Sequence, residues 1–279
     1  GDSEVARETN LYLPFGLTVD SNNNILVIDR SHYRIRRIDP KSGKVETVAG
    51  NGVKLFAGDG GPAAGATLSF PHGMCVDKED NLIFSDKGHY RIRKITPDGV
   101  ISTIGGNGIR GNVGDNVPAL EANFYNVTTI VQNLKGDMFM SSPSGFVSLI
   151  RRLDTKGVIH DFIDTASPKY REAISKSKYK GLVQTGAVAT ITQFSDIVFD
   201  PKGNLFISDR LNHQIRKIDN KGKISTIAGT GDSDHYGDNG PALEAAFRDP
   251  NALASDSEGN IYIADTANNM IRKIDTSGI

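Results

Sequence analysis

The amino-acid sequence predicts an all-β fold, a β-propeller of four-stranded antiparallel blades. Three observations lead to this prediction. The segment DRSHYRIRRID at residues 29–39 recurs along the chain at a nearly constant spacing. Short runs of β-forming residues alternate with turn residues. Stretches with the period of an α-helix are scarce. Radial repetition of small antiparallel sheets accounts for all three observations.

The repeated segment occurs five times. Successive copies start 57, 56, 67 and 56 residues apart, at Asp29, Asp86, Ser142, Asp209 and Asp265. Self-similarity at one period indicates a repeat architecture. The third copy, at 142–154, is two residues longer and begins with serine. Five units are therefore visible, and we expect five or six blades in the complete propeller.

The fourth unit shows the expected elements in order. Apolar runs at 196–200 and 205–209 flank a PKGN turn, and the alternating run at 214–219 follows the loop RLNH. An NKG turn then leads to the last run, at 223–229. Gly and Asn in such turns tolerate positive φ. In the third strand isoleucines point to one face and basic residues to the other, so these arginines are expected on a solvated or salt-bridged face.

A long loop follows the fourth strand and carries the sequence GDGGPA at 58–63, GDNVPA at 114–119 and GDNGPA at 237–242. Its prolines, Pro62, Pro118 and Pro241, suit the first position of a short helical turn. The preceding Asp59, Asp115 and Asp238 are expected to cap that turn. Because alternate connections of a blade lie at opposite ends, the long loops and the RSHY-type loops share one face. Function is expected on this long-loop face.

These elements resemble the NHL repeat. The similarity rests on GN-[LI]-[FY]-I-[SA]-D, on D-x-x-[NH]-x-x-I-R-[KR]-I-D, on TIAGTG and on the GDGGPA loop, and it covers almost the whole chain. The GDGGPA type is similar to the repeats of teneurin ectodomains and of bacterial secreted or surface proteins. The resemblance therefore implies a propeller platform with an extracellular or cell-surface location, a cytoplasmic one remaining open.

The two ends of the sequence suggest an excerpt. Residues 1–14 align without gaps with 237–250, and the chain stops where the fourth strand of the last unit should begin. We therefore expect one propeller domain over 1–279, taken from a longer chain. A five-bladed propeller with imperfect closure is the alternative. The missing outer strand also allows an architectural role, in which a neighbouring chain supplies it by strand addition and units self-assemble.

Composition narrows the partners. The net charge of -1 argues against binding to nucleic acid, and no apolar run approaches a transmembrane length. The recurrent Asp29, Asp86, Asp209 and Asp265 each precede an arginine by seven residues, which indicates structural pairs. The segment 231–240 is rich in carboxylates, but Leu243 stands where a calcium-binding loop has its twelfth ligand. No cofactor is therefore expected, with calcium kept as an alternative.

A polar ligand site is predicted where the first strands begin. These positions would form a channel mouth on the long-loop face, made by His72, Thr128, Ser195, Asp196 and Asn251. The residues that come directly after these entry positions, such as Gly16 and Gly73, are mostly small, as expected from crowding near the propeller axis. The family resemblance extends to lyases that hold zinc with three histidines and to lactonases that use channel carboxylates. Among the channel-mouth positions here, His72 is the one histidine and Asp196 the one carboxylate, so no metal or catalytic residues are assigned.

The third unit carries an insertion at 164–193 in place of its GD loop. Its basic residues could meet an acidic protein surface or an anionic glycan: Lys169, Arg171, Lys176, Lys178 and Lys180. The function we expect is a non-catalytic binding and scaffolding module for protein or glycan partners. A propeller enzyme of the lyase or lactonase kind, with a metal or small ligand at the channel mouth, is the main alternative.

Overall fold

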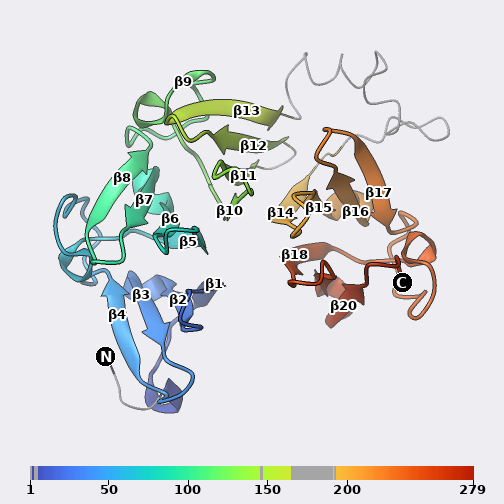
Figure 1. The fold of residues 1–279 in the computed structure, drawn as a ribbon, viewed down its shortest axis with the longest axis horizontal. Helices are drawn as coiled ribbons and strands as arrows, with labels where there is room; N and C mark the ends of the chain where they lie inside the picture. The colour runs from blue at the N-terminus through green and yellow to red at the C-terminus, as the bar shows by residue number, and fades with distance from the viewer. Residues whose placement is uncertain (1, 3–5, 145–146, 165–190, 192) are drawn as a thin grey trace. The chain divides into compact units, whose positions relative to one another are not determined.

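The structure is a computed structural model and describes residues 2, 6–144, 147–164, 191 and 193–279. All regular elements among these residues are strands or single turns of 3₁₀-helix. The strands form five separate antiparallel sheets, which appear as successive meanders in Figure 1. This confirms the predicted all-β fold of propeller blades. It follows that each sequence repeat makes one sheet.

The chain divides into two compact units. The first comprises residues 1–132, 136–140 and 152–160, and the second comprises 133–135, 141–151 and 161–279. The boundary runs through the third sheet. That the five repeats form one domain stays a prediction.

The first unit contains two complete four-stranded sheets. The strands of the first sheet are β1 (Pro14–Val19), β2 (Ile25–Asp29), β3 (Arg34–Ile38) and β4 (Val45–Ala49). Those of the second are β5 (Pro71–Val76), β6 (Leu82–Asp86), β7 (Arg91–Ile95) and β8 (Ile101–Gly105). A turn of 3₁₀-helix joins the second and third strand of each sheet, namely η2 (Arg30–His32) and η4 (Lys87–His89). Both turns lie at the long-loop ends of the strands.

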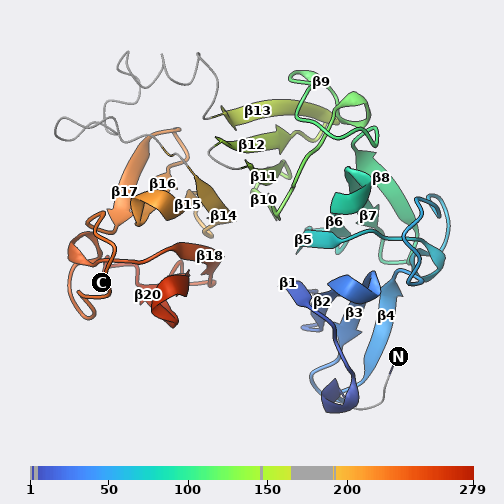
Figure 2. The ribbon, with the colours of Figure 1, turned by 180° about the vertical axis from the view of Figure 1, so that it is seen from behind.

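The third sheet has an additional strand. Its order is β10-β11-β12-β13-β9, from β9 (Val117–Pro118), β10 (Thr129–Gln132), β11 (Met138–Ser144), β12 (Val147–Leu153) and β13 (Val158–Asp164). The added strand β9 belongs to the GDNVPA loop of the preceding repeat and pairs with the outer strand β13 (Figure 2). The GDGGPA loop does the same more briefly, with Pro62 bridged to Val100. The long loops thus clasp the outer edge of the next sheet.

The second unit holds the last two sheets. The fourth is formed by β14 (Phe194–Phe199), β15 (Leu205–Asp209), β16 (Gln214–Ile218) and β17 (Ile224–Ala228). These match the predicted strands to within two residues at each end. The fifth has three strands, β18 (Pro250–Ser255), β19 (Ile261–Asp265) and β20 (Met270–Ile274). Ile271 on β20 is 74% exposed, whereas Ile215, its equivalent beneath a fourth strand, is fully buried.

The core lies between successive sheets. In the first unit, Leu26 and Ile28 of the first sheet pack with Met74 and Phe84 of the second. A second cluster joins Ile83 and Ile92 to the third sheet through the fully buried Phe124. The two faces of the second sheet therefore pack against different neighbours, which explains why β6 is buried at every residue.

Candidate functional site

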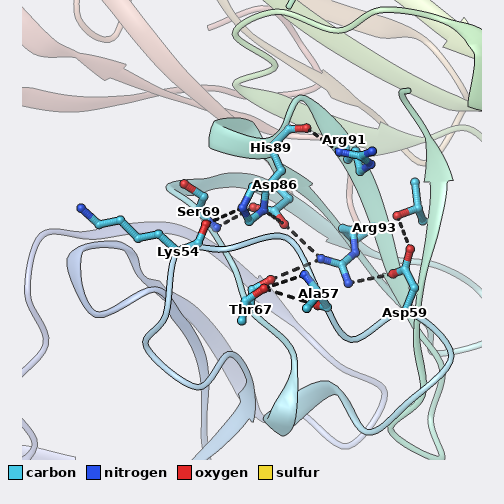
Figure 3. A network of polar contacts seen from close by, with 10 residues as sticks. Lys54, Ala57, Asp59, Thr67, Ser69, Asp86, His89, Arg91 and Arg93 are labelled. Atoms are coloured by element: carbon cyan, nitrogen blue, oxygen red, sulfur yellow. Dashed lines mark hydrogen bonds and ion pairs between the residues drawn. The ribbon is translucent and has the colours of Figure 1, made fainter. Parts of the chain in front are cut away.

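The strand-end aspartates are buried and fully engaged in structural contacts. In the second sheet, Asp86 Oδ1 accepts the Ser69 N–H at 2.7 Å, and Asp86 Oδ2 lies 2.8 Å from His89 Nδ1. Arg93 Nη1 donates to the same Oδ2 at 3.1 Å, and Arg93 Nη2 donates to Asp59 of the long loop at 2.7 Å (Figure 3). Arg93 itself is 0% exposed. The network therefore ties the GDGGPA loop to the sheet that it clasps.

The predicted Asp–Arg pairing recurs in the last two sheets. Arg216 Nε donates to Asp209 at 2.8 Å, and Arg272 lies 3.5 Å from Asp265 and 2.7 Å from Asp238. In the first sheet Arg36 contacts Asp2 at 3.1 Å and Thr47 at 2.7 Å. The expectation of structural pairs is confirmed for Asp86, Asp209 and Asp265. For Asp29 and Arg36 it stays a prediction. Sequence periodicity did not reveal that these arginines are buried rather than solvated.

In the third sheet a different carboxylate pairs with the buried arginine. Ser142 replaces the strand-end aspartate, yet Arg151 is still 1% exposed. Its Nε donates at 2.9 Å to Asp161 on β13, at the position that corresponds to Thr103 on β8. The carboxylate lost from the second strand is thus supplied by the fourth. The acidic residue on the fourth strand of the third repeat, which has no strand-end aspartate, was the sequence signal that could have predicted this pairing.

The expected role of the GD-loop aspartates as helix caps was wrong. The 3₁₀ turns η3 (Ala63–Gly65) and η8 (Ala242–Glu244) have no side-chain cap, and Pro62 and Pro241 precede their first helical residue. Asp59 instead accepts hydrogen bonds from Arg93 and Thr103, and Asp238 binds Arg272. A buried guanidinium attracts a nearby carboxylate more strongly than the end of a three-residue turn does.

The predicted channel-mouth residues of the first unit lie together. His72 is 8% exposed, and its Nδ1 donates to the carbonyl oxygen of Thr128 at 3.0 Å. The ring of Phe15 stacks on the imidazole with 4.0 Å between ring centroids. Since Nδ1 must carry the proton of this hydrogen bond, Nε2 of the neutral ring is the nitrogen left to accept.

The channel-mouth residues of the second unit are joined by backbone contacts. Asp196 Oδ1 accepts the Ile197 N–H at 3.0 Å, and Oδ2 accepts the Leu253 N–H at 2.8 Å. The Asn251 carbonyl accepts from Ser208 Oγ at 2.7 Å, while Ser195 is half-buried on β14. Asp196 therefore connects β14 to β18, the first strands of the two last sheets. That these residues bind a ligand stays a prediction.

The basic residues of the insertion, Lys169, Arg171, Lys176, Lys178 and Lys180, lie outside the residues that the structure describes. Their partner-binding role stays a prediction. Within the described ranges, no group of three or more His, Cys, Asp or Glu side chains is placed to hold a metal ion. No helix in that part of the chain is long and apolar enough to cross a membrane.

The first unit carries a surface of aromatic and cationic side chains that was not predicted from the sequence. We call it the aromatic–cation surface and define it by Phe15, Arg30, Lys54, Phe56, Phe70 and Lys87. The Arg30 guanidinium lies 5.7 Å from the Phe15 ring centroid and 5.8 Å from that of Phe70. The Lys54 ammonium lies 5.5 Å from the same Phe70 ring, which makes the surface continuous.

The long loop 51–58 extends this surface. Leu55 is 74% exposed, Val53 48% and Phe56 40%. The loop is held over η4 because the Lys54 carbonyl lies 2.6 Å from His89 Nε2, and the Arg91 guanidinium lies 3.9 Å from the Phe56 ring centroid. The apolar stretch VKLF, inside a loop otherwise rich in Gly and Asp, was the available sequence signal.

His72 borders this surface, and its pKa is expected to lie far below the usual value. Burial, together with the positive charges of Lys87 and Arg30, lowers the pKa of His72 from 6.5 to about 4, although the Thr128 hydrogen bond acts in the opposite direction. Because the folded-state pKa lies below the unfolded one, the associated stability is complete above pH 6.5 and declines as pH falls toward 4. An NMR titration of the imidazole should give a midpoint near 4 in the folded chain and near 6.5 in urea. A folded-state midpoint of 6.5 would show that the ring is solvated.

Comparison with known proteins identifies the repeats. The chain is 28% identical over 269 residues to SUPPRESSOR OF QUENCHING 1, chloroplastic, of Arabidopsis thaliana, covering 94% of this chain and 25% of that protein. It is 25% identical to human NHL repeat-containing protein 2, covering 96% and 39%, and 26% identical to mouse Teneurin-3, covering 90% and 10%. The chain thus spans between a tenth and two fifths of the length of these relatives. No family model matches it.

Solved structures agree on the fold. One chain in the crystal structure of a nidogen/laminin complex is similar, with a TM-score of 0.61 at 14% identity, covering 96% of this chain and 77% of that one. A gluconolactonase from Xanthomonas campestris gives 0.58 at 12% identity, covering 95% and 73%, and a streptogramin B lyase gives 0.55 at 16%, covering 100% and 70%. At these identities the likeness concerns the fold alone.

The five antiparallel sheets, each made by one repeat, define the class of this protein as a β-propeller. Its relatives include NHL repeat-containing protein 2 and the teneurins. The chain is thus similar to the NHL-repeat β-propeller proteins.

Proposed function

We propose that this propeller is a non-catalytic binding module whose long-loop face holds a protein partner. The observation that carries the proposal is the aromatic–cation surface together with the loop 51–58. Aromatic residues and arginine are enriched at the centres of protein interfaces, and Trp, Tyr and Arg dominate their binding energy. Five large apolar side chains here are at least 40% exposed: Phe15, Val53, Leu55, Phe56 and Phe70.

The opposite ends of the strands look different. There the short turns bind one another, since Ser21 donates to Asp80 from both its N–H, at 3.0 Å, and its hydroxyl, at 2.9 Å. In the same row of turns the Lys78 N–H donates to Gln132 at 3.4 Å. The short turns therefore serve cohesion between neighbouring sheets, which leaves the long-loop face as the candidate for a partner.

The contacts of Asp196 support binding over catalysis. A channel carboxylate that acts on a substrate needs an oxygen directed at it. Both oxygens of Asp196 accept backbone N–H groups, so the geometry favours a connecting role. A glycan partner is the alternative. We further propose an extracellular or cell-surface location, which the similarity to teneurins supports, although another relative is named as chloroplastic.

Replacement of Leu55 by aspartate should weaken partner binding by about tenfold or more, because a charge would enter the centre of the interface. The measurement is a quantitative affinity purification with the whole chain as bait, compared with a glycan array. The matched control is Leu134→Asp, since Leu134 is 72% exposed on a short turn. A partner lost with Leu55→Asp and kept with Leu134→Asp supports the proposal. Retention by both variants would place the interface elsewhere.

A further inference from the structure

One repeat position carries a cation in three of the five units. It is the residue that directly follows the strand-end aspartate, and it is occupied by Arg30, Lys87 and Arg210. In the fourth repeat this cation is neutralised. Arg210 Nη2 donates to Asp249 Oδ2 at 2.8 Å, and Nε donates to Oδ1 of the same carboxylate. Asp249 directly precedes β18, the first strand of the next sheet.

In the first unit the corresponding carboxylate is replaced. Phe70 precedes β5 as Asp249 precedes β18, so Arg30 faces an aromatic ring where Arg210 faces an acid. For Lys87 the corresponding residue is Asn126, a neutral amide. Both cations therefore lack the counter-charge that the same architecture supplies in the fourth repeat.

No other carboxylate takes its place. Among the residues that the structure describes, Arg30 and Lys87 form no ion pair, and Arg30 Nε is a buried donor without an acceptor. The two side chains are also near each other. Burial lowers the pKa of Lys87 and the charge of Arg30 lowers it further, while both charges act on the imidazole of His72. Two neighbouring cations without a counter-charge, one of which has a buried N–H group without an acceptor, favour the binding of an anion.

The surroundings add an apolar component. The rings of Phe15 and Phe70 flank the Arg30 guanidinium and are 45% and 40% exposed. Phe70 adopts φ +46, a left-handed conformation that is unfavourable for a bulky residue and acceptable for Asp or Asn. A strained, half-exposed aromatic residue at this position indicates a use other than packing.

We propose that Arg30 and Lys87, flanked by Phe15 and Phe70, bind the carboxylate of a Glu or Asp side chain in an acidic, partly apolar segment of the partner protein. A carboxylate is preferred to a phosphate because Asp249 fills the equivalent place in the fourth repeat. The adjacent rings would contact an apolar residue next to the acid. The inference rests on the proposed protein-binding function and specifies the chemistry of its partner.

The test uses the peptide N-acetyl-Glu-Phe-amide as the probe, with N-acetyl-Gln-Phe-amide as the matched neutral control. Binding to the whole chain is followed by the NMR resonances of the His72 imidazole. The Glu peptide is expected to shift them saturably, and the Gln peptide to bind at least about tenfold more weakly, as loss of a charged hydrogen bond implies. Equal responses to both peptides, or tighter binding of inorganic phosphate or glucuronate, would overturn the proposal.

Three variants locate the binding. Arg30→Gln should weaken the Glu peptide by about tenfold or more, while Lys44→Gln, which removes an exposed lysine of a short turn, should leave it unchanged. Phe70→Asp copies Asp249 and should place an internal carboxylate against Arg30, so that the peptide no longer binds although the chain stays folded. Unchanged binding by Arg30→Gln or by a folded Phe70→Asp variant contradicts the proposal. If those variants nevertheless retain the partner that Leu55→Asp loses, the carboxylate site fails and the proposed function stands.

Discussion

Replacement of Asp86 by serine is expected to lower the free energy of unfolding by about 3–5 kcal/mol, the usual effect of removing one partner from a buried ion pair. Asp86 is 0% exposed and accepts from Ser69, His89 and Arg93. Serine is too short to reach all three donors. Arg93 would keep the Thr67 carbonyl and, as its only carboxylate, Asp59, whose side chain is 36% exposed. Urea denaturation with an unchanged m value is the measurement.

The third repeat suggests how the loss can be repaired. It has Ser142 in place of the aspartate and Asp161 in place of Thr103, and Arg151 remains buried and paired. The double variant Asp86→Ser with Thr103→Asp should therefore recover about 1 kcal/mol or more relative to the sum of the single changes. Thr103→Asp alone should destabilise, because it brings a second carboxylate to Asp59, whose Oδ2 now accepts from the Thr103 hydroxyl at 2.7 Å. Strict additivity would show that Arg93 does not need a second acid.

Substitution of Gly73 by alanine is expected to cost about 2–3 kcal/mol, at the upper end of the usual overpacking range. A Cβ at this position would lie 2.4 Å from the carbonyl oxygen of Thr128 and 2.8 Å from the Cα of Thr129. Both are backbone atoms, which cannot rotate away. β10 would have to move from β5, and the hydrogen bond from His72 to Thr128 would break. The change is measured by urea denaturation and by the chemical shift of the His72 imidazole.

The control for Gly73 is Gly65, which has no heavy atom within 4 Å of its would-be Cβ and no positive φ. Gly65→Ala should change stability by less than about 0.5 kcal/mol. An equal loss for both glycines would contradict close packing as the cause, because a Cβ at Gly65 has no heavy atom within 4 Å to meet. If Gly73→Ala costs little, β5 and β10 can move apart easily. Crowding would then not explain why a small residue occupies this position.

Much of the fold could be predicted from the sequence because its determinants are local. The turn before each second strand is one example, since Asp77 accepts the Asn81 N–H at 2.8 Å within a five-residue segment. Such a turn needs only neighbouring residues, so its pattern is visible in the letters. The alternation of strands and turns is local in the same sense, and the predicted strands of the fourth repeat agree with β14 to β17.

The sites were less predictable because their partners are distant in sequence. Arg93 meets Asp59 across 34 residues, and Arg210 meets Asp249 across 39. Spacing within one repeat cannot show which loop reaches which sheet. For this reason Asp59 was expected to cap a helical turn, and the half-buried cations Arg30 and Lys87 were not distinguished from their neutralised counterpart Arg210.

The sequence by itself determined the repeat, its strands and its turns, because these follow from residue propensities over fewer than ten positions. The tertiary structure alone decided that one arginine of each third strand is buried, that the GD loops clasp the following sheet, and that Arg30 and Lys87 keep an unbalanced charge beside exposed aromatic rings. The physical reason is that burial and electrostatic neutralisation depend on groups brought together by packing. Which charges find a partner is settled only when neighbouring sheets and loops meet.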